Sequence, residues 1–98
     1  MKLANELWVI AMNAMTRNAK PYIRRIKRRA RWAARSSNMR CTVVISGKAR
    51  HVRVEIADAL YKEGFSVTTK YFDSVNDLDV VVDWSQPEEP RQPVHINI

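Results

Sequence analysis

The most informative absence in this sequence is that of acidic residues between Glu6 and Glu55. Residues 7–54 contain 13 Lys and Arg residues and no Asp or Glu, whereas residues 55–98 carry 9 acidic residues against 3 basic ones. The net charge of +7 therefore hides two regions of opposite sign. Like charges crowded on one helix repel each other, so folding alone does not favour this gap. An external anionic partner would offset the repulsion.

Cysteine, glycine and long apolar runs are also scarce. The single cysteine, Cys41, excludes an intrachain disulfide and favours a reducing compartment such as the cytoplasm. Two glycines argue against a Gly-rich phosphate loop, and no apolar run approaches the ~18–20 residues of a membrane span. The Arg-rich, acid-poor N-terminal region is also typical of transit peptides, but residues 22–34 carry an apolar stripe suited to a folded core.

Catalytic and metal-binding motifs are missing as well. Cys41, His51 and His95 lack the spacing of a metal site, and there is no nucleophile elbow and no paired-cysteine motif. Four aspartates surround one expected turn: Asp73, Asp77, Asp79 and Asp83. Carboxylates hold Mg2+ in some nucleases, but turns favour Asp, so we interpret these four as solvated or as partners of the basic residues. We therefore predict a protein that is not an enzyme and that uses no cofactor or metal.

Two N-terminal helices are predicted. The first covers residues 3–15, and its broad apolar arc indicates contact with more than one element or with a second chain. The arc comprises Leu3, Leu7, Trp8, Ile10, Ala11, Ala14 and Met15. Pro21 suits the first turn of a new helix, with either Asn18 as its N-cap or Lys20 as the last residue before it, and this second helix is expected to run to about residue 35. Its Lys and Arg residues lie opposite a narrow apolar stripe, and Trp32 falls near the middle of the basic face.

The remaining chain alternates between strands and one helix. Strands are predicted over residues 40–46, 65–72 and 78–84, a helix over residues 49–63, and a turn over residues 73–77. The first strand is apolar on both faces, so we expect it to be central and covered on two sides. The first two strands should form a parallel pair through the helix, with the third antiparallel to one of them. The predicted fold is α+β: two N-terminal helices and then β-α-β-β, with a small three-stranded mixed sheet and helices packed on it.

The domain is predicted to cover residues 1–84, followed by a Pro-rich, extended and mobile C-terminal tail over residues 85–98. Within the tail, residues 94–98 alternate like a strand and are expected to pair with a sheet edge, a neighbouring chain's edge included. This segment and the broad apolar arc of the first helix both favour a homo-oligomer.

Nucleic acid, DNA or RNA, is the partner that the basic residues favour most. Lys and Arg neutralise phosphates with little sequence preference, and Arg adds bidentate and stacking contacts. Trp32 offers a stacking surface for an unpaired base. The residues expected to contact nucleic acid are Arg17, Lys20, Arg24, Arg25, Lys27, Arg28, Arg31, Trp32, Arg35, Arg40, Lys48, Arg50 and Arg53.

Other functions fit the same charge pattern. An inhibitor would place the basic face on an acidic surface of a host protein. A small basic ribonuclease needs no sequence motif, and its candidate residues are Arg50, His51, Arg53, Tyr61 and Tyr71. Anionic lipid fits less well because the second helix has few bulky apolar groups. A basic surface without a partner is also disfavoured, because ordinary solvated faces mix charges of both signs.

One family resemblance covers about half of the chain. The apolar run of residues 41–45, the helix end at residues 62–67 and the hairpin that ends at residues 80–84 resemble small α+β proteins of tailed bacteriophages. Several of those proteins are thought to act on host or phage nucleic-acid machinery. The resemblance implies a bacterial host cytoplasm and a non-enzymatic role, and it transfers no functional residue.

Overall fold

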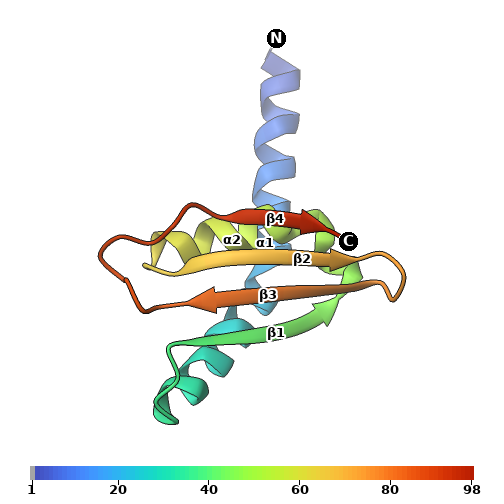
Figure 1. The fold of residues 1–98 in the computed structure, drawn as a ribbon. Coiled ribbons are helices and arrows are strands. Elements are labelled where there is room, and N and C mark those ends of the chain that lie inside the picture. The colour runs from blue at the N-terminus through green and yellow to red at the C-terminus, as the bar shows by residue number, and fades with distance from the viewer. Residues whose placement is uncertain (1) are drawn as a thin grey trace.

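The computed structural model describes residues 2–98, which form an α+β fold with two α-helices, a short 3-10 helix and one four-stranded mixed sheet (Figure 1). In chain order the elements are α1 (Lys2–Arg35), β1 (Arg40–Ser46), η1 (Gly47–Val52), α2 (Arg53–Lys62), β2 (Ser66–Phe72), β3 (Asp77–Asp83) and β4 (Val94–Asn97). The predicted α+β class is confirmed. The detail differs, because one N-terminal helix replaces two, four strands replace three, and the helix expected over residues 49–63 is divided into η1 and α2.

The N-terminal region is a single helix of 34 residues, so the predicted break before Pro21 is wrong. Proline has no N–H for the carbonyl of Arg17 four residues earlier, but both residues are exposed, so water can satisfy that carbonyl. Ala19, just before Pro21, is 1% exposed and belongs to the core, as does Ile26 on the other side. Packing on both sides of Pro21 thus keeps the helix continuous through a residue that propensity alone treats as a boundary.

The sheet has the strand order β1-β3-β2-β4, with β3 antiparallel to both of its neighbours (Figure 1). β1 and β2 therefore run parallel, as predicted, but they are not adjacent, because β3 lies between them. β1 is an edge strand and not the predicted central one. Val43 and Ile45 are buried, whereas Thr42 and Val44 are exposed, because both helices lie on one face of the sheet.

The core lies between that inner face and the two helices. α1 contributes Ile26 and α2 contributes Ile56 and Leu60, and all three side chains are fully buried. Each such residue contributes roughly 1.5–3 kcal/mol through burial of apolar surface. Val80 and Val82 of the central strand β3 are equally buried, so the predicted inward face of β3 is confirmed.

The C-terminal segment contributes the fourth strand. β4 pairs in parallel with β2, with Val94 opposite Thr68, and the amide of Ile98 donates to the carbonyl of Tyr71 at 2.8 Å. The expectation that residues 94–98 pair with a sheet edge is confirmed, and the edge belongs to the same chain. The connecting residues 85–93 form no helix or strand.

Candidate nucleic-acid interface

Five arginines line the side of α1 that faces away from the sheet, and we call them the basic stripe. At ~100° per residue they lie opposite the buried positions Ala19, Ile26 and Ala30. Their side chains are all exposed. The basic stripe consists of Arg17, Arg24, Arg28, Arg31 and Arg35. It arises because the same 3.6-residue period that sends one face of α1 into the core sends the intervening arginines outward.

Intramolecular carboxylates do not neutralise the basic stripe. Within residues 2–98 the one ion pair joins Lys27 to Glu63, with Nζ 2.7 Å from Oε2. An exposed pair of this kind contributes about 0–1 kcal/mol. The guanidinium groups of the basic stripe are therefore available to an external anion.

The other cations of α1 face its two flanks. Lys20 and Lys27 line a groove against α2 that also contains Glu55, Asp58 and Glu63, so local carboxylates balance their charge. On the opposite flank, Arg25 lies beside the edge strand, with Nη2 3.5 Å from the carbonyl oxygen of Val44. Trp32 is 68% exposed and lies on the outer side between the arginines, as predicted.

The structure does not bring the remaining four predicted residues into the basic stripe. Arg40 lies on the open face of the sheet, opposite Asp83 in the register with β3. Lys48 is exposed at the start of η1. Arg50 and Arg53 line a separate hollow around Tyr71, and the Arg50 guanidinium lies 5.0 Å from the centre of that ring. The interface that the sequence predicted as one patch is therefore divided between the basic stripe and several separate surfaces.

That hollow also collects most of the predicted ribonuclease candidates. Arg50, His51, Arg53 and Tyr71 all line it, whereas Tyr61 lies elsewhere and accepts a hydrogen bond from Gln92. The Nδ1 atom of His51 is hydrogen-bonded to the carbonyl oxygen of Lys48. A carbonyl only accepts, so Nδ1 carries the proton and Nε2 is free to act as a base.

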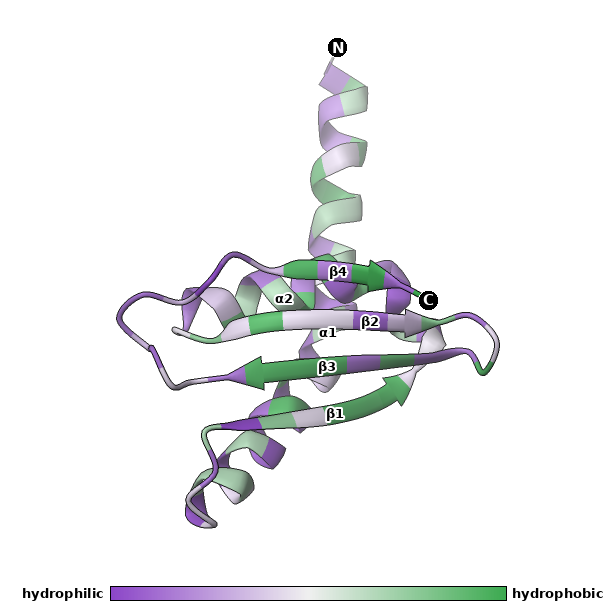
Figure 2. Ribbon diagram, in the orientation of Figure 1, coloured by the Kyte–Doolittle hydropathy of each residue, from purple (hydrophilic) through white to green (hydrophobic). Residues whose placement is uncertain are grey.

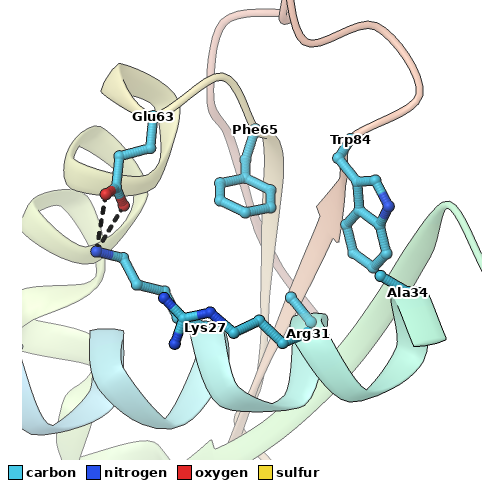
Figure 3. Close-up of a pocket in the computed structure, with 7 residues that line it drawn as sticks. Lys27, Arg31, Ala34, Glu63, Phe65 and Trp84 are labelled. Atoms are coloured by element: carbon cyan, nitrogen blue, oxygen red, sulfur yellow. Dashed lines mark hydrogen bonds and ion pairs between the residues drawn. The ribbon is translucent and has the colours of Figure 1, made fainter.

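An aromatic pocket adjoins the basic stripe, and sequence reasoning missed it (Figure 3). Phe65 and Trp84 form its floor, with ring centroids 6.1 Å apart in an edge-to-face arrangement. Figure 3 shows the side chain of Arg31 extending along α1 toward that of Lys27, on the side of the pocket away from Trp84, and that of Lys27 reaching Glu63. Arg31 thus belongs both to the basic stripe and to the rim of the aromatic pocket.

The aromatic pocket has a simple cause in side-chain size. Phe65 precedes β2 and Trp84 follows β3, so both rings lie at strand ends, where α1 presents the small residues Ala30 and Ala34 between the longer Lys27 and Arg31. Small residues opposite large rings leave the rings half-buried with open space above them. The sequence signal was the alanine pair at a spacing of four, but the strand order was needed to place it over the rings.

Three ionisable groups outside the basic stripe have shifted pKa values. Burial raises the pKa of the Cys41 thiol, an effect that Arg29 partly opposes, so the thiol stays protonated. Hydrogen bonds from Ser85 lower the pKa of Asp83. Burial, followed by the charge of Arg53, lowers the pKa of His95. Within residues 2–98 no cluster of His, Cys, Asp and Glu side chains has the geometry of a metal site.

The described helices are too short or too polar to cross a membrane. A scan against protein-family models and searches of curated proteins and of solved structures gave no match to this chain, so the functional assignment rests on the geometry above.

Proposed function

We propose that this protein binds single-stranded nucleic acid along the outer side of α1. The observation that carries the proposal is the basic stripe: five exposed arginines in one row, without a carboxylate partner among the described residues. From Arg17 to Arg35 the row is about 27 Å long, from the helical rise of ~1.5 Å per residue. Arginines at this density hold phosphates by charge and by bidentate hydrogen bonds.

Two aromatic features favour single strands over duplex as the ligand. Trp32 presents an exposed indole beside the basic stripe, and base stacking on such a ring contributes about 1–3 kcal/mol. The aromatic pocket offers a second apolar surface within reach of Arg31, large enough in outline for one flat ring system (Figure 3). Both features need unpaired bases, which a duplex does not present.

Fluorescence anisotropy with a labelled single-stranded oligonucleotide tests the proposal. If the basic stripe makes five phosphate contacts, the salt slope should be about −3.5, a loss of roughly 100-fold in affinity between 50 and 200 mM salt. The double variant Arg28→Gln with Arg31→Gln should reduce that slope by about 1.4 and weaken binding about tenfold or more. A duplex of the same length should bind less tightly.

A matched control separates the basic stripe from net charge. Arg40→Gln with Arg91→Gln removes the same two charges from the open face of the sheet. This control should leave the affinity and the salt slope nearly unchanged. An equal loss of affinity in both double variants, or an affinity that does not depend on salt concentration, would contradict the proposal.

An acidic protein surface is the competing partner, and a pull-down from bacterial lysate distinguishes it. With nuclease treatment before elution, nucleic acid and the proteins that it carries should be lost. One stoichiometric protein that survives the treatment, and that Arg28→Gln with Arg31→Gln releases, would replace nucleic acid as the ligand.

RNA cleavage is a second candidate, favoured by the convergence of Arg50, His51 and Arg53 on the hollow around Tyr71. Two guanidinium groups would hold a phosphodiester, and His51 Nε2 would accept the proton of the 2′-hydroxyl as its oxygen bonds to phosphorus. The bond from phosphorus to the 5′-oxygen would break in the same step, and the leaving 5′-oxygen would take a proton from water. The hydroxyl of Tyr71 already donates its proton to Asn76 Oδ1 at 3.0 Å, so we assign it no part in the reaction. Incubation of labelled RNA with and without Mg2+ decides: products that disappear in His51→Ala support cleavage, and intact RNA excludes it.

A further inference from the structure

The N-terminal part of α1 extends beyond the sheet and α2 as a free helix, and we call residues 2–15 the apolar projection (Figure 1). Leu3, Leu7, Trp8 and Ile10 are each more than half exposed, at 56–65%. Figure 2 shows this part of α1 as largely apolar and clear of the rest of the chain. A helix that is apolar over most of its circumference is normally buried, and a continuous exposed apolar surface marks an interaction site.

The apolar projection has the residue pattern of a close helix–helix contact. Ala4, Leu7, Ala11 and Ala14 repeat at spacings of three, four and three residues, which places them in one seam like the a and d positions of a heptad. Three of these four are alanine, so a second helix can approach closely along the seam. Leu3 and Ile10 flank the seam on one side and Trp8 flanks it on the other, at positions where solvated coiled coils carry charges. Met15, on the same side as Trp8, packs partly against the core of its own chain.

A second copy of this chain fits that seam better than a lipid surface does. Helices that lie on membranes carry Lys and Arg on their polar face, but residues 3–16 contain neither, and their one charged side chain is Glu6. Val9 and Met12 also extend the apolar surface to the side away from the seam, which a flat bilayer would leave in water. The same seam on two copies is self-complementary, as a two-fold interface requires.

We infer that two copies associate through their apolar projections, with the helices antiparallel. A register centred on residue 9 places Leu7 opposite the partner's Ala11 and Ala4 opposite the partner's Ala14, so large and small residues alternate across the seam. At the two flanks of the seam, Ile10 then lies near the partner's Ile10 and Trp8 near the partner's Trp8. This inference does not depend on nucleic-acid binding.

Charge selects the antiparallel orientation. In a parallel pair, the two basic stripes would run side by side at an interaxial distance of ~8–10 Å, and five arginines on each would repel. In the antiparallel register, the two Arg17 residues are about 24 Å apart along the axis, three times the ~8 Å Debye length at physiological salt. The opposed helix dipoles also favour this arrangement.

The size of the contact sets its expected strength. A helix of 14 residues is about 21 Å long, so the contact falls at or below the ~1,200 Å² that marks the low end of specific interfaces. The dimer should therefore dissociate in the micromolar range and be visible as a mass that rises with protein concentration.

Sedimentation velocity across a series of protein concentrations tests the inference. The wild-type chain should shift from monomer to dimer, whereas Ala11→Glu, which places a charge in the seam, should stay monomeric. Asn13→Glu adds the same charge to an exposed position outside the seam and should dimerise like the wild type. Circular dichroism should show the same helix content in both variants. A wild-type chain that stays monomeric, or equal loss in both variants, would overturn the inference.

Spin labels test the orientation. With Cys41→Ser to remove the native thiol, Thr16→Cys carries a label at the end of the projection. The antiparallel dimer places the two labels about 21 Å apart along the axis, whereas a parallel dimer places them side by side. Binding of the monomer to anionic vesicles, abolished by Ala11→Glu, would make lipid the occupant and reject the second copy.

Discussion

The two halves of α1 share one helix and differ in almost every physical property. Residues 2–15 are mostly apolar, contain no arginine and, apart from Met15, do not pack against the core, whereas residues 17–35 carry the basic stripe on one side and core residues on the other. Propensity does not separate them, because both are good helix formers. What separates them is the surroundings: the sheet covers one side of the basic half and leaves the apolar projection without intramolecular cover.

This difference shows that one continuous helix can carry two chemically distinct surfaces, one apolar and one basic. Because α1 is continuous through Pro21, helical geometry sets the position of the apolar projection relative to the basic stripe. A partner bound to one half is therefore held at a defined place relative to the other. An antiparallel dimer would present two basic stripes at opposite ends, and a long single strand bound to both would gain from effective concentration.

The largest expected effect is a difference in stability when the same substitution, isoleucine to alanine, is made in each half of α1. Ile26→Ala empties a fully buried position and should lower the free energy of unfolding by about 2–5 kcal/mol. Ile10→Ala makes the same change where the side chain is 61% exposed, and at low protein concentration it should have little effect. Urea denaturation of both variants measures the difference. A large loss in Ile10→Ala in the monomeric range would mean that the projection folds back on the chain.

A second prediction concerns the residue that joins the halves. Pro21→Ala restores an N–H that can bond to the carbonyl of Arg17, and it removes the steric conflict of the ring with that carbonyl. Because Pro21 is exposed and packs against nothing in the core, the change should stabilise the protein by up to ~3 kcal/mol. Thermal denaturation checks the sign, and Arg24→Ala, on the same helix without a backbone effect, serves as the control. Destabilisation by Pro21→Ala would indicate that the helix needs a bend there.

The sequence predicted local elements well and their arrangement less well. β1 has its predicted bounds, β2 begins one residue later than predicted, and β3 begins and ends one residue earlier. The agreement is close because alternation of apolar side chains has a period of two wherever one face is buried. Gly64 ends α2 with a φ of +94°, the left-handed conformation that glycine adopts at helix ends, as its position after the helix indicates.

The arrangement depends on contacts between residues that are distant in the chain. Nothing local indicates that β3 inserts between β1 and β2, so β1 was expected to be central when it is an edge. For the same reason, the sequence grouped Arg40, Arg50 and Arg53 with the basic helix, although Arg40 lies on the open face of the sheet and Arg50 and Arg53 line the hollow around Tyr71. The basic stripe was predictable because helical periodicity alone defines it, and the aromatic pocket was not, because three separate elements form it.

The smallest expected effect is that of pH on the free energy of unfolding. It arises in the sheet that packs against the basic half of α1. His95 in β4 has a lowered pKa in the folded chain, and its Nδ1 is hydrogen-bonded to the hydroxyl of the buried Thr69. The unfolded chain therefore binds more protons below about pH 6.5, so the free energy of unfolding should fall as the pH drops through that value and level off below the folded pKa. Asp83 adds a separate loss at lower pH, because its lowered pKa stabilises the fold only while the carboxylate is charged.

Urea denaturation on either side of about pH 6.5 measures the first loss, and His95→Gln, which keeps a hydrogen-bonding side chain but does not titrate, should remove it. The apolar projection contains no histidine, so protonation in this range does not act on it directly. Dimerisation should therefore keep its concentration dependence at a pH where β4 is weakened but the chain remains folded. If the dimer were lost together with β4 and retained in His95→Gln, the C-terminal strand would be part of the contact between copies, and the two halves of α1 would no longer act as separate surfaces.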